Sequence, residues 1–273
     1  MKVILARYGE IALKGKNRIN FENKLKDNIK RSVECSVKKT SGRFVIYPED
    51  TAKAVSKLKK IFGLVSISIA EEVDVDMDKI KEECLNQTRG RKFDTFRISV
   101  QRSLKKLRPS PELEKEIGAY IVEKTAKRVK LKNPDLEISV EVSDSGYVFS
   151  EKMACVGGIP AGIEGRVALL IENRESILAG LLAMKRGCDI VPVAIKNINA
   201  DVLREYGCQR EIINIKKISE IEAIAEKNNC KAIVVGQQLK YVKDVPVSLP
   251  VLRPLAGISP EKAEQILRMG REE

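Results

Sequence analysis

Hydrophobic and polar positions along the first 70 residues predict strands and helices in alternation. Residues 3–8 have the pattern of a buried strand, and Phe21, Leu25 and Ile29 recur every four residues. Such spacing predicts a helix with one apolar stripe. A strand over residues 43–47, a helix around 55–61 and an alternating strand over 65–69 complete a βαβαβ order. This order predicts a ferredoxin-like α+β domain.

The middle of the chain begins with an acidic stretch, residues 71–78, which we predict to be a linker running into a helix. Further on, Phe96, Ile98 and Val100 alternate with polar residues. Successive strand residues point to opposite faces, so we expect Arg97 to face away from the core.

A basic loop, residues 101–109, follows that strand. We expect Ser110 to cap a helix that runs to about residue 129, with a proline at its first position. Residues 138–142 predict another alternating strand, and residues 157–162 form a glycine-rich loop. That loop is the expected boundary before the last domain.

The last 110 residues alternate between strand and helix patterns, which predicts an open parallel sheet of the α/β class. Ser219 and Glu222 have the spacing of a capping box. Ligands of such sheets bind at the carboxyl ends of the strands. The predicted strands are residues 167–171, 190–195 and 232–235, and the predicted helices are 177–185, 219–227 and 259–269.

Composition then narrows the chemistry. The 273-residue chain contains no histidine, which excludes Ser-His-Asp triads, His-activated cysteines and His-ligated zinc. None of its six cysteines lies in a C-x-x-C pair, so we expect no metal site. We expect the cysteines to be buried thiols. No apolar run approaches the roughly 18 residues that span a bilayer, and we expect a cytoplasmic protein without a membrane partner.

The net charge is +12 and is unevenly distributed. Residues 1–160 contain 33 basic and 23 acidic side chains, whereas residues 161–273 contain 17 and 15. A concentrated basic excess is typical of proteins that bind a polyanion such as a nucleic acid. Solvated lysines that only maintain solubility are the alternative.

Twelve consecutive residues, Arg7 to Arg18, closely resemble the opening signature of the tRNA 4-thiouridine synthases, also called tRNA sulfurtransferases. Residues 95–162, including the glycine-rich loop, resemble the THUMP domain of that family. Residues 183–187 and 250–255 are similar to segments of its adenylation domain. The similarity covers nearly the whole chain in the family's order.

The resemblance implies three domains: a ferredoxin-like domain over residues 1–72, a THUMP domain over 73–163 and a Rossmann-like PP-loop domain over 164–273. In the family the first two dock tRNA, and the third adenylates a uridine that is then thiolated. The resemblance implies tRNA as the partner. The basic residues that we expect to contact its phosphates are Lys14, Lys16, Arg18, Arg97, Arg102, Lys105, Lys106 and Arg108.

The family's PP-loop reads Ser-Gly-Gly-x-Asp-Ser, but this chain has Glu172-Asn173-Arg174-Glu175-Ser176 after Ile171. Glycines let a backbone approach pyrophosphate and present N–H groups to it, whereas Glu172 adds negative charge there. The family's acidic Thr-Gly-Glu-like turn is replaced by neutral glutamines after Gly236. The segment that carries the family's catalytic cysteine is short here, and we expect no rhodanese domain to deliver sulfur.

Three hypotheses follow. The first is a tRNA-binding protein with a degenerate adenylation site and no cofactor. The second is an active, ATP-dependent sulfurtransferase whose variant pocket is lined by Leu169, Leu170, Ser176 and Gly236, with sulfur from a separate donor or an inorganic source. The third is a partner-binding or homodimerising module that assists a catalytic protein.

Overall fold

The computed structural model describes residues 1–13, 15–40, 42–103, 107–196 and 198–268. The chain divides into two compact units, each assembled from separated segments. The first consists of Met1–Ala6, Cys35–Thr51 and Ile67–Met153, and the second of Arg7–Glu34, Ala52–Ser66 and Ala154–Glu273. None of the helices in the described ranges is long and apolar enough to cross a membrane.

Most residues of the larger sheet belong to the first unit. Its strand order is β2-β3-β1-β4-β8-β7-β5-β6, and β9 pairs with β4. The strands are β1 (Lys2–Tyr8), β2 (Cys35–Thr40), β3 (Arg43–Pro48), β4 (Leu64–Val73), β5 (Thr95–Arg102), β6 (Arg128–Val129), β7 (Leu136–Val142), β8 (Gly146–Phe149) and β9 (Met153–Ala154).

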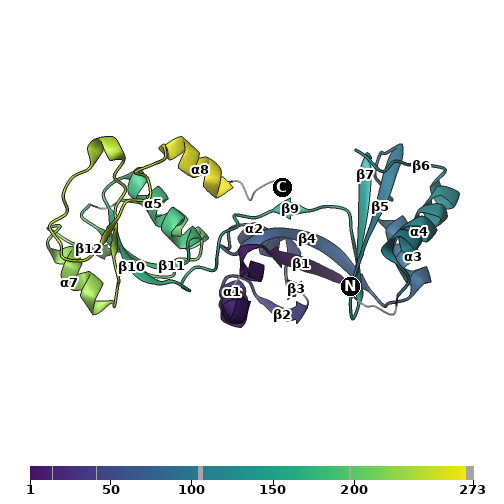
Figure 1. Cartoon of the computed structure of the whole chain (residues 1–273), viewed down its shortest axis with the longest axis horizontal. Coiled ribbons are helices and arrows are strands. Elements are labelled where there is room, and N and C mark those ends of the chain that lie inside the picture. Colours follow the sequence, from purple (N-terminus) through teal and green to yellow (C-terminus); the bar gives the residue numbers. More distant parts are fainter. Residues whose placement is uncertain (14, 41, 104–106, 197, 269–273) are drawn as a thin grey trace. The chain divides into compact units, whose positions relative to one another are not determined.

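Two helices of the first unit, α3 (Met77–Asn86) and α4 (Ser110–Thr125), pack beside β5 and β7 (Figure 1). The alternation predicted for β5 is confirmed, because Phe96, Ile98 and Val100 are buried in the same apolar cluster as Ile80 of α3 and Leu113 of α4. Their burial gives this part of the chain its own core.

The second unit contains a parallel sheet, as predicted from its alternating strands and helices. The order is β12-β11-β10-β13-β14, with two short strands, β12 and β14, that the sequence pattern did not reveal. The strands are β10 (Gly165–Ile171), β11 (Cys188–Ala194), β12 (Ile213–Asn214), β13 (Ile233–Val234) and β14 (Val251–Leu252). The helices are α1 (Arg18–Ser32), α2 (Thr51–Leu58), α5 (Arg174–Lys185), α6 (Asp201–Glu205), α7 (Glu220–Lys227) and α8 (Pro260–Arg268).

Apolar side chains cover both faces of this parallel sheet, as a sheet flanked by helices requires. One cluster joins alternate residues of β10, such as Leu169, to α5, α6 and α8. The other joins Leu170 to α7 on the opposite face, and Figure 1 shows α5 and α7 on either side of the strands. The register pairs Gly165 with Cys188 and Ile171 with Ala194, so these pairs mark the amino and carboxyl edges of the sheet.

Several local expectations are corrected. The order of strands and α-helices from β1 to β4 is βαββαβ and not the predicted βαβαβ, because residues 35–40 form β2, which pairs antiparallel with β3. The acidic stretch is not a linker from its first residue, because β4 continues to Val73. The helix that begins at Ser110 ends at Thr125, where Ala126 adopts a left-handed conformation, and its N-cap position is occupied by Pro109 and not by Ser110. The capping box at the start of α7 does not form, since Glu222 accepts hydrogen bonds from Ser248 instead.

Candidate functional site

Residues 171–176, which were compared with the family's PP-loop in the sequence, lie at the carboxyl edge of the parallel sheet. Strand β10 ends at Ile171, residues 172–173 form the connection, and α5 begins at Arg174. A helix N-terminus in this place presents backbone N–H groups and the positive end of the helix dipole to an anion. The site therefore depends on whether those N–H groups remain available.

Side chains of the connection use those groups. Asn173 caps α5, because its Oδ1 accepts hydrogen bonds from the Ser176 backbone N–H at 3.0 Å and from the Ser176 hydroxyl at 2.9 Å. The Ser176 Oγ in turn accepts the Glu172 backbone N–H at 3.2 Å. Ser176 is only 1% exposed. These bonds satisfy internally the Ser176 N–H and hydroxyl and the Glu172 N–H, polar groups that a phosphate would otherwise contact.

Gly236 closes the same helix start from the neighbouring strand. It follows β13, and a Cβ atom placed on it would lie 2.3 Å from the Ser176 backbone nitrogen and 2.6 Å from the Glu175 carbonyl carbon. No side chain fits at that distance, so the backbones of residue 236 and of the first turn of α5 lie against each other. This packing occupies the space in front of the Ser176 N–H.

The remaining residues expected for a nucleotide pocket do not lie together around one pocket. Leu169 and Leu170 are buried in the clusters on opposite faces of the sheet, so their side chains do not line a common pocket. Gln237, which stands where the family has its acid, accepts hydrogen bonds from Arg253 Nε at 3.0 Å and from the Lys243 backbone N–H at 3.2 Å. A neutral amide therefore organises this turn.

Three thiols of the parallel-sheet domain lie away from the carboxyl edge. Cys188 begins β11, Cys208 contacts the Ile190 carbonyl oxygen at 3.8 Å, and Cys230 precedes β13, which places all three toward the amino edge. Burial raises the pKa of each of these thiols. Thiolate is the reactive form, so the three cysteines resemble structural thiols more than nucleophiles. The expectation of buried thiols is confirmed for Cys208 and Cys230, whereas Cys188 is half-buried.

The basic residues predicted to meet tRNA are described only in part. Lys14, Lys105, Lys106 and the side chain of Lys16 lie outside the described residues. Arg18 is engaged inside its own unit, where its Nε donates to the buried Glu22 carboxylate at 2.8 Å and its Nη2 donates to the Tyr8 hydroxyl at 3.2 Å. Its charge is therefore partly neutralised.

Three predicted arginines belong to the first unit. Arg97 lies on the polar side of β5, as expected, and donates to the Leu131 carbonyl oxygen at 3.4 Å. Arg102 ends the same strand. Arg108 forms an ion pair with Glu116 of α4 while its side chain remains 55% exposed. The structure places Arg97 and Arg102 on one strand and Arg108 two residues before the next helix, α4.

A second basic segment was missed. Residues 127–132 contain Lys127, Arg128, Lys130 and Lys132, and the last three are exposed. They flank and form β6, the edge strand next to β5, and Arg97 reaches the carbonyl oxygen of Leu131 in this segment. Four cations within six residues were visible in the sequence, but the predicted helix to residue 129 concealed that they lie on a strand edge.

Comparison with known proteins shows which class of protein has these domains. The family model for the ThiI ferredoxin-like domain matches residues 3–68, and the THUMP domain model matches residues 74–150. The fold is thus that of a THUMP-domain protein with a ferredoxin-like partner domain and a parallel-sheet domain, which confirms the predicted fold class.

Relatives identify the family. A protein of Acetivibrio thermocellus named "Probable tRNA sulfurtransferase" is 31% identical over 98% of this chain and 84% of its own length. One of the same name from Thermoanaerobacter sp. is 29% identical over 94% and 82%. The chain belongs to the tRNA sulfurtransferase family. The first of these alignments extends over 329 positions, more than the chain's 273 residues, so the relative carries residues without a counterpart here.

Two solved structures share the fold along the chain. PH1313 from Pyrococcus horikoshii is 27% identical with a TM-score of 0.87, and the alignment covers 97% of this chain and 98% of that one. A 4-thiouridine synthetase, solved as an RNA complex with bound ATP, is 29% identical with a TM-score of 0.83, covering 97% and 85%.

Proposed function

We propose that this protein binds tRNA through its ferredoxin-like and THUMP domains and that its parallel-sheet domain has lost the ATP site of the family. The observation that carries the second part is the closed carboxyl edge. There the Ser176 N–H is bonded to Asn173, and Gly236 lies directly against the same backbone. A pyrophosphate needs those N–H groups free and approachable.

The first part rests on family and charge. The chain belongs to a family whose named members act on tRNA, and its relative was solved with RNA. The basic excess lies in residues 1–160, in the part of the chain that matches the two docking domains. Double-stranded RNA is recognised mainly through shape and phosphate contacts, which lysine and arginine provide. This function would place the protein in the cytoplasm with its tRNA.

The proposed contact residues form two groups. Arg97 and Arg102, with the exposed segment 127–132, make a basic edge around β5 and β6 in the first unit. Lys14, Lys16, Lys105 and Lys106 are added on their sequence alone. Arg18 and Arg108 contribute less in this proposal, because each already pairs with a carboxylate.

The binding of labelled tRNA at increasing salt concentrations tests the docking proposal. A protein that neutralises 6–10 phosphates becomes weaker by about 10³–10⁵ in affinity between 50 and 200 mM salt. Replacing Arg128, Lys130 and Lys132 by alanine should weaken binding and reduce the salt slope by about one for each phosphate-binding charge that is removed. The charge-matched control replaces Lys227, Lys231 and Lys262, exposed lysines of the parallel-sheet domain. Equal reductions of affinity in both variants would contradict docking at the β6 edge.

The alternative function, an ATP-dependent sulfurtransferase, is favoured by one observation: the related 4-thiouridine synthetase holds ATP. Sulfur would then come from a separate donor or an inorganic source. Thermal unfolding with ATP separates the two functions, because a ligand at 100 times its dissociation constant adds about 2.7 kcal/mol of stability. We expect no shift. A shift, together with ATP–pyrophosphate exchange in the presence of tRNA, would establish the enzyme instead.

A further inference from the structure

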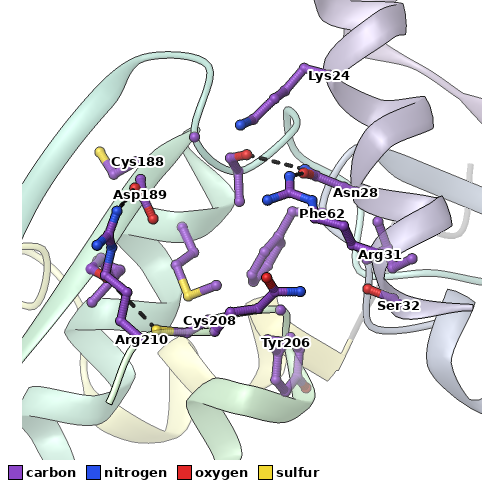
Figure 2. Close-up of a pocket in the computed structure, with 17 residues that line it drawn as sticks. Lys24, Asn28, Arg31, Ser32, Phe62, Cys188, Asp189, Tyr206, Cys208 and Arg210 are labelled. Atoms are coloured by element: carbon purple, nitrogen blue, oxygen red, sulfur yellow. Dashed lines mark hydrogen bonds and ion pairs between the residues drawn. The ribbon is translucent and has the colours of Figure 1, made fainter. Parts of the chain in front are cut away.

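A cavity of about 300 Å³ lies within the second unit at the amino edge of the parallel sheet, opposite the edge that holds Ser176 and Gly236. One wall is the helix α1, and the other is formed by the start of β11 and the loop after α6 (Figure 2). The loop of residues 157–162, part of the sequence motif that resembled the THUMP domain, contributes Ala161 and Gly162. No function described above uses this space.

The wall formed by α1 is polar, because polar residues recur along one face of this helix. Lys24, Asn28 and Arg31 recur at intervals of four and three residues, so they share one face of the helix. Figure 2 shows all three directed toward the cavity. Asn28 Nδ2 donates to the Ala161 carbonyl oxygen at 3.1 Å, which joins α1 to the glycine-rich loop. The same face of α1 therefore holds the loop and lines the cavity.

The two cations of this wall lack acidic partners among the described residues. Arg31 donates only to the Asp27 carbonyl oxygen and to Asn28 Oδ1, both neutral acceptors. Lys24 has no hydrogen bond or ion pair within the described ranges. Its Nζ would lie only 2.8 Å from a Cβ on Gly162, so a glycine at that position leaves room for the ammonium group. Both charges are available to a ligand.

The opposite wall adds a third cation. Arg210 donates to Asp189 at 3.1 Å, while its buried Nε has no hydrogen-bond partner in the described part of the chain. Asp189 also accepts Arg166 Nε at 3.0 Å, so the lining carboxylate is shared by two arginines. Burial alone would raise the pKa of Asp189, but the hydrogen bonds from Arg210 and Arg166 lower it below its ordinary value. The cavity therefore has more positive than negative charge.

We propose that this cavity binds the phosphate group of a small phosphate monoester. Guanidinium groups match phosphate oxygens in a bidentate geometry, and a lysine adds a compact charge. A volume of 300 Å³ is at the small end of ligand pockets and far exceeds the roughly 30 Å³ that one water occupies. Phe62 and Met184 provide apolar wall for the organic part of the ligand. A nucleoside monophosphate has this combination of groups.

The thiol of Cys188 reports on the site, because it lines the cavity and is half-buried. Alkylation of Cys188, followed by peptide mass spectrometry, is compared with no addition, inorganic phosphate, uridine 5′-monophosphate, uridine and tRNA. We expect phosphate and the monophosphate at millimolar concentration to slow alkylation of Cys188 and not of Cys35, the half-buried thiol of β2. Protection by phosphate alone supports a bare phosphate site, and stronger protection by the nucleotide supports the full ligand.

Substitutions then locate the charges. Lys24→Gln and Arg31→Gln should each weaken phosphate binding about tenfold or more, as expected when a hydrogen bond to a charged group is removed. Lys30→Gln removes an exposed charge from the same helix outside the cavity lining and should change binding less than twofold. Circular dichroism verifies that each variant is folded. Weakened phosphate binding in either folded variant, Lys24→Gln or Arg31→Gln, is enough to assign the charge to the site.

Three results would overturn the proposal. The first is no protection of Cys188 by either phosphate compound. The second is equal protection by uridine, which would remove the role of the phosphate. The third is protection by tRNA with none by the small compounds, which would assign the cavity to nucleic acid. The assay does not depend on tRNA binding or on ATP, so its failure is distinguishable from failure of the function proposed above.

Discussion

The two edges of the parallel sheet differ in how their polar groups are satisfied. At the carboxyl edge, Asn173 accepts hydrogen bonds from the Ser176 N–H and hydroxyl, and the backbone of Gly236 packs directly against the same residues. At the amino edge, Lys24 and Arg31 face a cavity with no carboxylate of their own within the described residues. One edge has its hydrogen-bonding groups paired internally, and the other has charge that an anion would complete.

Under the proposed function, this difference is how a binding site is lost while its fold remains. The strand, the helix and their connection at the carboxyl edge are all present, so the architecture of the family is kept. In that proposal the groups offered to a phosphate differ, because Glu172 and Asn173 stand where the family motif has glycines. A fold therefore predicts where ligands could bind, and the local hydrogen bonds determine whether they do.

The largest effect is expected from Gly236→Ala. The added Cβ would lie within 2.6 Å of backbone atoms of residues 175 and 176, which cannot rotate away as a side chain could. Overpacking of this kind costs typically 1–3 kcal/mol, and we expect a destabilisation of about 2–3 kcal/mol. Urea unfolding followed by circular dichroism measures it, since the chain has no tryptophan.

Gly257→Ala is the matched control. A Cβ at this glycine meets nothing within 4 Å, and its φ is not positive. Its stability should stay unchanged or rise by up to about 1 kcal/mol through the unfolded state. If Gly236→Ala behaved like Gly257→Ala, the carboxyl edge would be open enough for a ligand, and the contrast between the two edges would fail.

The sequence predicted the framework more reliably than the sites. Strict alternation in Phe96, Ile98 and Val100 and the four-residue stripe of α1 determined their elements, because burial on one face leaves a period that can be read directly. The strands β6, β9, β12 and β14 were missed, since two residues are too few to show a period, and the longer strands β2 and β8 were not predicted either. The prediction of a capping box in α7 was wrong, because the backbone N–H of Ser248, which is distant in sequence, donates a hydrogen bond to the Glu222 carboxylate.

The candidate sites divide in the same way. The absence of glycines before Ser176 could be recognised from the sequence alone. The hydrogen bonds that Asn173 accepts from the Ser176 N–H and hydroxyl could not. The amino-edge cavity had no sequence signal, because α1, the glycine-rich loop and the loop after α6 are far apart along the chain. Only the tertiary fold brings Lys24 and Arg210 to one space.

A smaller effect is expected from Asn173→Ala. Removal of the cap leaves the Ser176 N–H without its acceptor and should cost about 1 kcal/mol, the typical destabilisation for an N-cap replaced by alanine. Asn173→Asp keeps a side-chain oxygen in the same place and should retain most of the stability. Urea midpoints of the three proteins give the comparison. An equal destabilisation in both variants would mean that the amide nitrogen, and not the capping oxygen, holds this turn.

The smallest effect concerns the charge balance of the cavity at the amino edge. Asp189→Asn removes the carboxylate shared by Arg166 and Arg210 and should destabilise the fold by less than about 1 kcal/mol, because the Asp189 side chain is 37% exposed and its ion pairs are screened. The same change should tighten phosphate binding severalfold, since it leaves the cavity with more net positive charge.

The pH dependence of that destabilisation identifies its cause. The pKa of Asp189 is lowered in the folded state, so its contribution is present above the ordinary aspartate pKa of about 3.9 and is lost as the pH falls through the folded value. The difference between wild type and Asp189→Asn in urea unfolding should therefore be present at neutral pH and shrink below about pH 4. Asp244→Asn, an exposed carboxylate with no ion pair in the described ranges, should show neither effect. A difference for Asp189→Asn that stayed constant with pH would point to altered packing, and the arginines would then be held in the cavity without this charge.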